Sequence, residues 1–446
     1  MHIDEAGAVI LRDGTPLDSL LDRERRNLSA RVHADAEIFE LELERLFAKA
    51  WIPVAHVSEF RQPGDFVTRA IGLDPVIVTL DDDGRHRVLL NVCTHRGAAV
   101  CRAEEGNTQV HRCPFHGWGF GSDGTLVGVP FDRQIYAGTL DKPNLGLRQA
   151  RVETAVGLVF ATWDDDAPSL KEYLGDFQWY LEAMLCRTDN GLEVAGAPQR
   201  FVIDCNWKVL TEGFFGDAYH VLTVHQSFAD IGVLSHTDTT LRQFEVSHNG
   251  HALLCFDFER LGLTGEPAEV LARMTPTGMP PELVDQVQRN LSPEQMALMA
   301  KTPPSIAGIF PTASAIFVGA GPASPLGQVV SLRFFVPLSP HRTEMLSFTM
   351  VERDATLEFK ESVHRSSVQA FGVGGMFEAD DVEVWASVQR GVRGAIGRRT
   401  LDNYQVLGQP AEHHGRLDYA GRGISSDEQQ WLFYERYFDF LEGRAW

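Results

Sequence analysis

The chain has few cysteines and no long apolar run. Its 446 residues include six cysteines, which lie scattered along the sequence. Few, scattered cysteines in a long chain indicate a reducing compartment and argue against a disulfide framework. No apolar run approaches the ~20 residues that a membrane helix needs, and the first residues lack the basic and apolar regions of a signal peptide. We therefore expect a cytoplasmic protein that does not bind a membrane.

Basic residues are also scarce, 40 against 61 acidic residues, which gives a net charge of −21. So acidic a chain is a poor match for nucleic acid or an anionic membrane, and neither is expected as a partner. The acidic surface is interpreted as solvated, although it could also steer a basic redox partner. A hydrophobic content of 44% is ordinary, and the length predicts two domains, each with its own core.

Two short segments combine cysteine with histidine. Cys93-Thr-His95 and Cys113-Pro-Phe-His116 are separated by seventeen residues. Two thiolates and two imidazoles at this spacing are the ligand set of a Rieske [2Fe–2S] cluster, in which two histidines replace two cysteines on one iron. The proline and the following glycine of the second segment favour tight turns that can aim N–H groups at sulfur. The motif predicts a protein that transfers single electrons.

A structural zinc site is the alternative, because zinc also accepts two cysteines and two histidines. Zinc sites usually place Cys with Cys and His with His along the chain, whereas each segment here mixes one of each. The cluster is the preferred interpretation, and a zinc-stabilised interaction protein remains the alternative. The two predict different proteins, since a cluster is coloured and zinc is not.

Short β segments between Trp51 and Thr162 predict an all-β unit over residues 45–165, with both cysteine-histidine segments at hairpin tips. An acidic run at residues 164–166, followed by a proline at 168, is the most natural boundary. Residues 1–34 are expected to be a polar lead-in. Helices are expected at residues 35–49, 169–185, 281–301, 353–395 and 426–441, and strands at 66–71, 75–80, 87–92, 119–120, 125–129, 152–162, 201–204, 252–258, 315–318, 329–336 and 344–351.

A second group of donors lies beyond this boundary. His220 and His225 are followed much later by Asp380 and Asp381. Two histidines and one carboxylate on one face of a metal, with open positions opposite, form the facial triad of non-haem Fe(II) oxygenases. A packed, hydrogen-bonded histidine is the alternative. The i, i+5 spacing places the histidines about 140° apart on an ideal helix, so one ion requires a π-bulge, a break or a helix end between them.

These motifs together resemble the large (α) subunits of Rieske-type aromatic ring-hydroxylating dioxygenases. The resemblance spans nearly the whole chain. It rests on the two cysteine-histidine segments, on Asn206-Trp-Lys-x-x-x-Glu-x-x-x-x-Asp-x-Tyr-His-x-x-x-x-His225, and on Phe377-Glu-x-Asp-Asp-x-Glu383. It implies an α+β fold: an all-β Rieske domain, residues 45–165, and a catalytic domain, residues 166–446, with a central antiparallel sheet flanked by helices. Residues 1–44 are then a helical lead-in that belongs to the catalytic domain.

The resemblance also assigns site residues. Asp381 is preferred to Asp380 because the family's ligand is the second aspartate of the pair. Asp217 matches a carboxylate that links a cluster histidine of one subunit to an iron histidine of its neighbour; orienting His220 alone is its alternative role. The cluster ligands implied are Cys93 and Cys113 on one iron and His95 and His116 on the other, and the mononuclear iron ligands are His220, His225 and Asp381.

The implied substrate cavity is apolar and aromatic. Its residues are Phe214, Ala218, Val221, Phe371 and Phe377, with Ile306 and Ile316 as weaker candidates. Such a surface suits a flat hydrocarbon through area burial and ring contacts. No Arg or Lys falls on these positions, which makes an aromatic acid the second choice. Many relatives carry Asn or Gln where this chain has Gly213, so the pocket is expected to be larger here.

The resemblance implies a terminal oxygenase that inserts both atoms of O₂ into a mono- or polycyclic arene to give a cis-dihydrodiol. Electrons would come from a ferredoxin and a separate NAD(P)H-dependent reductase, because the chain has no Gly-x-Gly-x-x-Gly after a strand. An α₃β₃ assembly with a small β subunit, or an α₃ homotrimer, is expected. A Rieske monooxygenase acting on an aromatic acid is the near alternative. A pure electron carrier is disfavoured, since it needs no second metal site.

Overall fold

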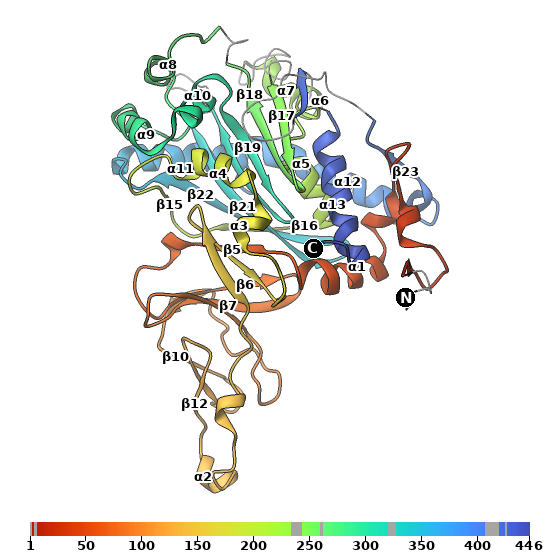
Figure 1. Ribbon diagram of the computed structural model, residues 1–446, viewed down its shortest axis with the longest axis vertical. Coiled ribbons are helices and arrows are strands. Elements are labelled where there is room, and N and C mark those ends of the chain that lie inside the picture. Colours follow the sequence, from red (N-terminus) through yellow and green to blue (C-terminus); the bar gives the residue numbers. More distant parts are fainter. Residues whose placement is uncertain are drawn as a thin grey trace. The chain divides into compact units, whose positions relative to one another are not determined.

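The computed structural model describes residues 2–3, 7–232, 243–258, 262–319, 327–405, 419–423 and 426–446. The chain divides into two compact units, one formed by Met1–Leu46 with Lys171–Trp446 and the other by Phe47–Leu170. Both units appear in Figure 1, coloured along the sequence. Among the described residues, no helix combines the length and apolar character that crossing a membrane requires.

The unit Phe47–Leu170 consists of antiparallel strands. A four-stranded sheet has the order β8-β7-β6-β9, a three-stranded sheet the order β13-β14-β5, and a small sheet the order β10-β11-β12. The central strand β7 buries Val76, Ile77 and Val78 completely, which places it at the core of the unit. The strands are β5 Ile52–His56, β6 Asp65–Ile71, β7 Asp74–Leu80, β8 His86–Leu90, β9 Glu105–Asn107, β10 Val110–Arg112, β11 Gly119–Gly121, β12 Leu126–Gly128, β13 Arg151–Ala155 and β14 Leu158–Thr162.

The single strand predicted over residues 152–162 is wrong. The structure has a hairpin of β13 and β14, because Val156 and Gly157 both take positive φ angles, 50° and 83°. Two consecutive residues with positive φ form the kind of two-residue turn that matches the twist of antiparallel strands. The alternating apolar pattern continues through the turn, so the pattern alone does not reveal it.

The other unit is built on a nine-stranded antiparallel sheet with the order β15-β22-β21-β20-β19-β18-β17-β24, in which β16 also pairs with β22. Figure 1 shows β18, β19, β21 and β22 running through this unit. The strands are β15 Leu192–Val194, β16 Gln199–Ile203, β17 Gln243–His248, β18 His251–Phe256, β19 Pro304–Ile309, β20 Ala313–Val318, β21 Val329–Ser339, β22 Arg342–Glu352 and β24 Tyr419–Gly423.

Helices cover both faces of this sheet. Successive residues of a strand point to opposite faces, and on β20 the side chain of Ile316 packs with Phe214 on one face. The next residue, Phe317, faces Met184 and Met299 on the other. Burial on both faces explains why β20 and β21 read as nearly continuous apolar runs. Together with the all-β unit, this confirms the predicted α+β class with an antiparallel sheet flanked by helices.

Several predicted helices are interrupted. The helices are α1 Ala36–Glu42, α2 Asp132–Ile135, α3 Leu170–Leu174, α4 Phe177–Leu185, α5 Trp207–Phe214, α6 Val221–Val224, α7 Gln226–Asp230, α8 Pro267–Arg273, α9 Val284–Asn290, α10 Pro293–Lys301, α11 Leu357–Phe371, α12 Met376–Val392 and α13 Glu428–Glu442. The predicted helix over 353–395 is two, because glycines at 372, 374 and 375 separate α11 from α12. The helix over 169–185 breaks at Gly175, whose φ is 52°.

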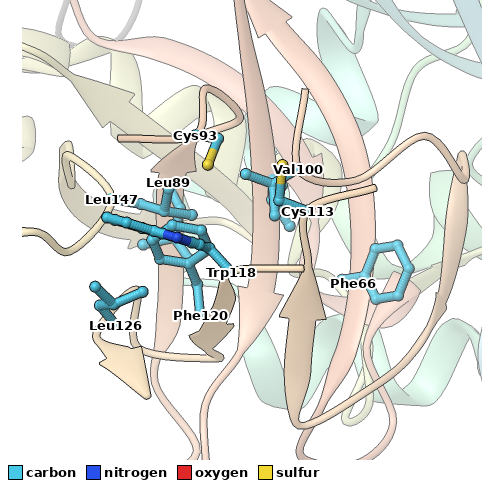
Figure 2. Close-up of a cluster of buried hydrophobic side chains, with 10 residues drawn as sticks. Phe66, Leu89, Cys93, Val100, Cys113, Trp118, Phe120, Leu126 and Leu147 are labelled. Atoms are coloured by element: carbon cyan, nitrogen blue, oxygen red, sulfur yellow. The ribbon is translucent and has the colours of Figure 1, made fainter. Parts of the chain in front are cut away.

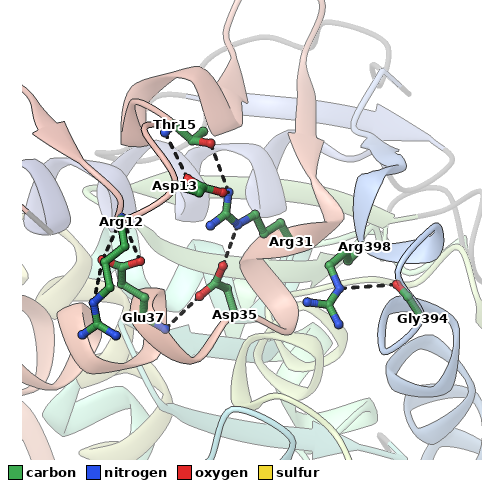
Figure 3. Close-up of polar contacts among 8 residues, drawn as sticks. All are labelled: Arg12, Asp13, Thr15, Arg31, Asp35, Glu37, Gly394 and Arg398. Atoms are coloured by element: carbon green, nitrogen blue, oxygen red, sulfur yellow. Dashed lines mark hydrogen bonds and ion pairs between the residues drawn. The ribbon is translucent and has the colours of Figure 1, made fainter.

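The polar lead-in predicted for residues 1–34 is also wrong. Leu11 and Leu28 are completely buried, and the segment contains short strands and 3₁₀ turns rather than solvated chain. Figure 3 shows how charge ties it to the first helix: the Arg31 guanidinium contacts Asp13 at 2.7 Å and Asp35 at 2.6 Å. Asp35 in turn caps α1 by accepting the N–H of Glu37 at 2.8 Å.

A buried carboxylate joins three helices of this unit. Glu42 at the end of α1 accepts hydrogen bonds from the indole of Trp207 (2.8 Å) and from the hydroxyl of Tyr437 on α13 (2.5 Å), and it pairs with the ammonium of Lys208. Burial lowers the pKa of Lys208, while Glu42 opposes this shift. Trp207 and Lys208 are the first two residues of α5, so their contacts with Glu42 fix where α5 begins.

Candidate metal centres

The two cysteine-histidine segments fold into matching loops. In each loop the cysteine N–H donates to the carbonyl five residues on, Ala98 or Trp118, at 2.8 Å. The N–H of Gly97 or Gly117 donates back to the cysteine carbonyl at 2.8 and 3.0 Å. Both glycines take positive φ angles, 78° and 75°, which closes each loop tightly. The second loop is the tip of the β10–β11 hairpin, as predicted. The first loop connects β8 and β9, which do not pair with each other, so its predicted place at a hairpin tip is wrong.

The side chains of these loops suit metal ligation. Cys93 and Cys113 are buried, and Figure 2 shows their sulfur atoms beside Trp118 and the apolar core of the unit. Burial raises the pKa of the Cys93 thiol, and the adjacent Cys113 thiol raises it further. His95 and His116 lie with ring centroids 4.5 Å apart. Among the residues that the structure describes, the buried Nδ1 atom of His95 has no hydrogen-bond partner, as expected of an atom that a metal would engage.

Sequence reasoning missed the residue that holds the first loop. The side chain of Asn91 accepts hydrogen bonds from the N–H groups of Val100 (2.9 Å) and Cys101 (2.8 Å), and it donates to the Cys101 carbonyl at 2.8 Å. Asn91 is buried, and its hydrogen bonds connect the chain just before the loop with the chain just after it. A polar residue at the end of an apolar strand, two positions before Cys93, was the available signal.

The second group of donors depends on an interrupted helix. His220 immediately precedes α6, and His225 lies between α6 and α7 with φ −104° and ψ 20°. The helix therefore ends at His225, which is one of the three solutions that the i, i+5 spacing requires. Before it, Gly216 at φ 99° turns the chain after α5. The two imidazoles consequently face the same region from the two ends of α6.

Asp381 on α12 completes this group. Its Oδ1 atom lies 3.2 Å from Nε2 of His225 and 3.4 Å from Nε2 of His220. One ligand atom from each of the three residues falls within 4.8 Å of the others. His225 and Asp381 are buried, whereas His220 is partly open. These two nitrogens and one oxygen would therefore hold one ion here.

Each histidine has a second carboxylate behind it. Nδ1 of His220 lies 3.2 Å from Asp217, and Nδ1 of His225 lies 3.6 Å from Asp380. A carboxylate behind the imidazole orients the ring and directs its other nitrogen to a metal. Asp217 is itself held by the N–H groups of Tyr219 (3.0 Å) and His220 (3.3 Å). Both aspartates of the pair therefore lie next to His225, whereas the sequence assigned a position at the site to Asp381 alone.

The electrostatics favour a cation at this site. Burial lowers the pKa of His220, but Asp217 and then Asp381 outweigh burial and raise it to about 10. Burial raises the pKa of Asp381, and the two histidines outweigh that effect, so its pKa is lowered. Metal ligands must be deprotonated, so binding of a divalent metal here would release any proton that these groups hold. The donor set and its charge therefore fit mononuclear iron.

Two of the residues assigned to the substrate cavity, Phe377 and Phe371, lie beside this group. Phe377 meets His225 edge-on with ring centroids 4.9 Å apart, and Phe371 stacks on Phe377 at 5.4 Å. Phe214 is buried against Phe335 with centroids 5.5 Å apart. The remaining assigned residues also lie in this unit: Ala218 is buried, Val221 is half-buried, and Ile306 and Ile316 pack in the same apolar cluster as Phe214.

The expectation that Gly213 enlarges the pocket is wrong. A Cβ atom added to Gly213 would lie 3.2 Å from both Cζ2 and Nε1 of Trp385. Trp385 is on α12, one turn after Asp381, and meets Phe214 edge-on at 5.3 Å. The indole therefore occupies the space that a larger residue at position 213 would use. This contact joins α5 to α12, and no feature of the sequence near Gly213 predicts it.

A buried arginine also enters this region. Arg333 on β21 is fully buried, and its guanidinium carbon lies 4.3 Å from the ring centroid of Phe214 and 5.1 Å from that of Phe371. It pairs with the buried Glu378 of α12 at 2.8 Å. Sequence reasoning placed no basic residue among the cavity positions. One charged residue inside the apolar run 329–336 was the available signal.

Comparisons with known proteins agree with this architecture. Residues 50–144 match the model of the Rieske [2Fe-2S] domain, and residues 170–442 match that of the ring hydroxylating alpha subunit (catalytic domain). The chlorobenzene dioxygenase α subunit of Cupriavidus sp. (strain PS12) is 33% identical, with 96% of this chain and 94% of that protein covered. The N,N-dimethyl phenylurea N-demethylase α subunit of Sphingobium sp. (strain YBL2) is 35% identical, with 85% and 84% covered.

Among solved structures, the naphthalene 1,2-dioxygenase from Rhodococcus sp. bound to indole is similar, with a TM-score of 0.84, 34% identity and coverage of 94% and 95%. These matches define an iron–sulfur oxidoreductase with a non-haem iron domain. The chain belongs to the family of ring-hydroxylating dioxygenase α subunits, whose cofactors are a Rieske [2Fe–2S] cluster and a mononuclear iron. The resemblance noted from the sequence is confirmed, and a zinc-stabilised interaction protein is not supported.

The contact between Gly213 and Trp385 gives a testable prediction. Gly213→Asn should overpack this space and lower the free energy of unfolding by about 1–3 kcal/mol. A second substitution, Trp385→Leu, should recover most of that loss, because it vacates the same space. Thermal unfolding of the two single variants and the double variant measures the coupling. Gly391→Asn on α12, the helix that carries Trp385, is the control, since a Cβ there meets no atom within 4 Å; additive effects of Gly213→Asn and Trp385→Leu would contradict the contact.

Proposed function

We propose that this chain is the terminal oxygenase α subunit of a multicomponent system that adds both atoms of O₂ to a neutral mono- or polycyclic arene, giving a cis-dihydrodiol. The observation that carries the proposal is the apolar aromatic surface formed by Phe371 and Phe377 directly beside His225. A flat hydrocarbon gains most from such a surface through burial and ring contacts. Relatives named for chlorobenzene and naphthalene support this class of substrate.

We further propose Cys93, His95, Cys113 and His116 as the cluster ligands, and His220, His225 and Asp381 as the ligands of the mononuclear iron. The bound iron supplies the chemistry that activates O₂ with electrons from the cluster. The chain's residues prepare this step. Asp217 holds the Nδ1 side of His220, and Asp380 lies 3.6 Å from Nδ1 of His225, while both Nε2 atoms face Asp381. Phe377 and Phe371 would hold the ring against this face and exclude water from it.

The electron donors and the subunit assembly can be inferred from features of the chain. We propose a ferredoxin and an NAD(P)H-dependent reductase as electron donors, since the sequence has no dinucleotide-binding glycine motif after a strand. We also propose an α₃β₃ assembly or an α₃ ring. The support is Asp217, whose side chain remains 35% exposed in the isolated chain although it holds His220. Its open side could accept a cluster histidine, His116, of an adjacent subunit.

A second candidate function is monooxygenation by the same metals. The similarity to an N-demethylase α subunit over 85% of the chain favours it. An aromatic acid is a poor substrate for either reaction, because Arg333 in this region is already paired with Glu378. The two candidates therefore differ in the fate of the oxygen atoms rather than in the surface that binds the ring.

Turnover with ¹⁸O₂ distinguishes these functions. The holoenzyme, supplied with a ferredoxin and reductase, is incubated with arenes of one, two and three rings and with an N,N-dimethyl phenylurea. We expect cis-dihydrodiols that carry two labelled oxygen atoms, identified by mass spectrometry. Demethylated phenylurea together with unreacted arenes would support the monooxygenase instead.

The choice of carboxylate gives a second prediction. Native protein should contain about three iron atoms per chain, two in the cluster and one at the mononuclear site. Asp381→Ala should contain about two, lose activity and keep the Rieske absorption, because a ligand is lost from one site only. Asp380→Ala is the matched variant, and it should weaken iron binding by about 10–100-fold through the orientation of His225. Loss of the third iron in Asp380→Ala with retention in Asp381→Ala would reverse the assignment.

Asp217→Asn tests the proposed path between subunits. The amide keeps the shape of the carboxylate but loses its charge. We expect both metal centres to stay largely occupied, while product formation falls by about 10–100-fold, the range typical of residues that orient metal ligands. In stopped-flow experiments the cluster should be reduced rapidly and product should form slowly in a single turnover. Normal turnover of Asp217→Asn, or a fully active monomer, would contradict the path.

A further inference from the structure

The fully buried Arg333 is connected to the metal group through aromatic rings. Its guanidinium lies over Phe371, which stacks on Phe377, which in turn meets His225 edge-on. On its other side the guanidinium lies over Phe214 at 4.3 Å. A fully buried cation therefore lies directly behind the aromatic rings proposed to bind the substrate.

Glu378 is the close anionic partner of this cation. The two side chains approach to 2.8 Å and both are almost completely buried. The other contacts of the guanidinium are long: 3.4 Å to the hydroxyl of Ser331, 3.6 Å to the sulfur of Met345 and 3.4 Å to the carbonyl of Phe371. Among the described residues, neither oxygen of Glu378 has a regular hydrogen bond, so Arg333 is the group that balances its charge.

A buried, unpaired guanidinium is costly, and its planar fork matches a carboxylate. An arginine left free beside an arene would therefore recruit an aromatic acid. With Glu378 in place, an incoming carboxylate finds the cation already paired and meets the negative charge of Glu378 and of Asp381 on the same helix. A neutral arene incurs neither cost. Specificity of this kind arises from repulsion of the wrong ligand as much as from attraction of the right one.

We propose that Glu378 is a specificity-determining residue, which selects neutral arenes over aromatic carboxylates by occupying the fork of Arg333. The inference rests on the proposed function for the location of the substrate, and it deepens that function by naming the residue that sets the charge class of the ligand. If the ion pair between β21 and α12 were purely structural, removing one charge would create no affinity for a new ligand. In the proposed role, removing one charge creates affinity for a defined class of charged ligand.

The test measures binding without turnover. Naphthalene and 2-naphthoate are titrated into anaerobic, iron-loaded holoenzyme, and the ratio of their dissociation constants is compared between variants. In Glu378→Gln the preference should shift toward 2-naphthoate by at least about tenfold, because a carboxylate then pairs with the free guanidinium. Glu383→Gln is the matched control, since it removes a carboxylate from the exposed face of the same helix and should leave the ratio unchanged.

Arg333→Met provides the opposite arm. It leaves the anion of Glu378 unpaired, so the preference should shift toward 2-naphthylmethylammonium by a similar factor. The double variant Arg333→Met/Glu378→Met should favour neither charged ligand. An iron-loaded Glu378→Gln protein whose ratio is unchanged overturns the proposal; if that variant does not retain iron, an unchanged ammonium preference in Arg333→Met overturns it. Failure of the proposed function is recognised separately, as absence of labelled diol from the native enzyme.

Discussion

A surplus of negative charge, part of it buried, is the constraint on which the metal-bearing unit depends. Asp217, Asp380 and Asp381 surround two imidazoles, and Glu378 lies one turn before Asp381 on the same helix. Carboxylates are rarely buried unless a cation balances them. Arg333 balances Glu378, and the geometry of the remaining groups leaves a place for a divalent ion. The fold therefore specifies a cation at this point before any substrate is considered.

The helix that leads to the metal group is held at its opposite end. Glu42 fixes the start of α5 through Trp207 and Lys208, and α5 ends just before the turn that leads to His220. The interruption at His225 then lets two imidazoles five residues apart face one carboxylate. The local sequence of these helices does not by itself fix where they lie. The buried hydrogen bonds of Glu42 and the contacts among His220, His225 and Asp381 fix their positions together.

The surface beside the metal group shows how residues far apart in the chain compensate one another. Trp385 fills the space above Gly213, and Glu378 neutralises Arg333. In both pairs one partner lies on α12, the helix that also carries Asp381. Changes to the proposed ligand-binding surface are therefore linked to the position of a proposed metal ligand, and a substitution in one member of a pair is best interpreted together with its partner.

The sequence by itself determined the metal chemistry and the family, because cluster donors within each short segment are close along the chain and their spacing is diagnostic. It also predicted most strands and helices from periodicity. Only the tertiary structure decided the hairpin at Val156–Gly157, the place of Asp380 behind His225, the indole over Gly213 and the arginine among the phenylalanines. These features depend on backbone φ angles or on contacts between distant segments, and sheet register and helix packing, rather than local pattern, bring such segments together.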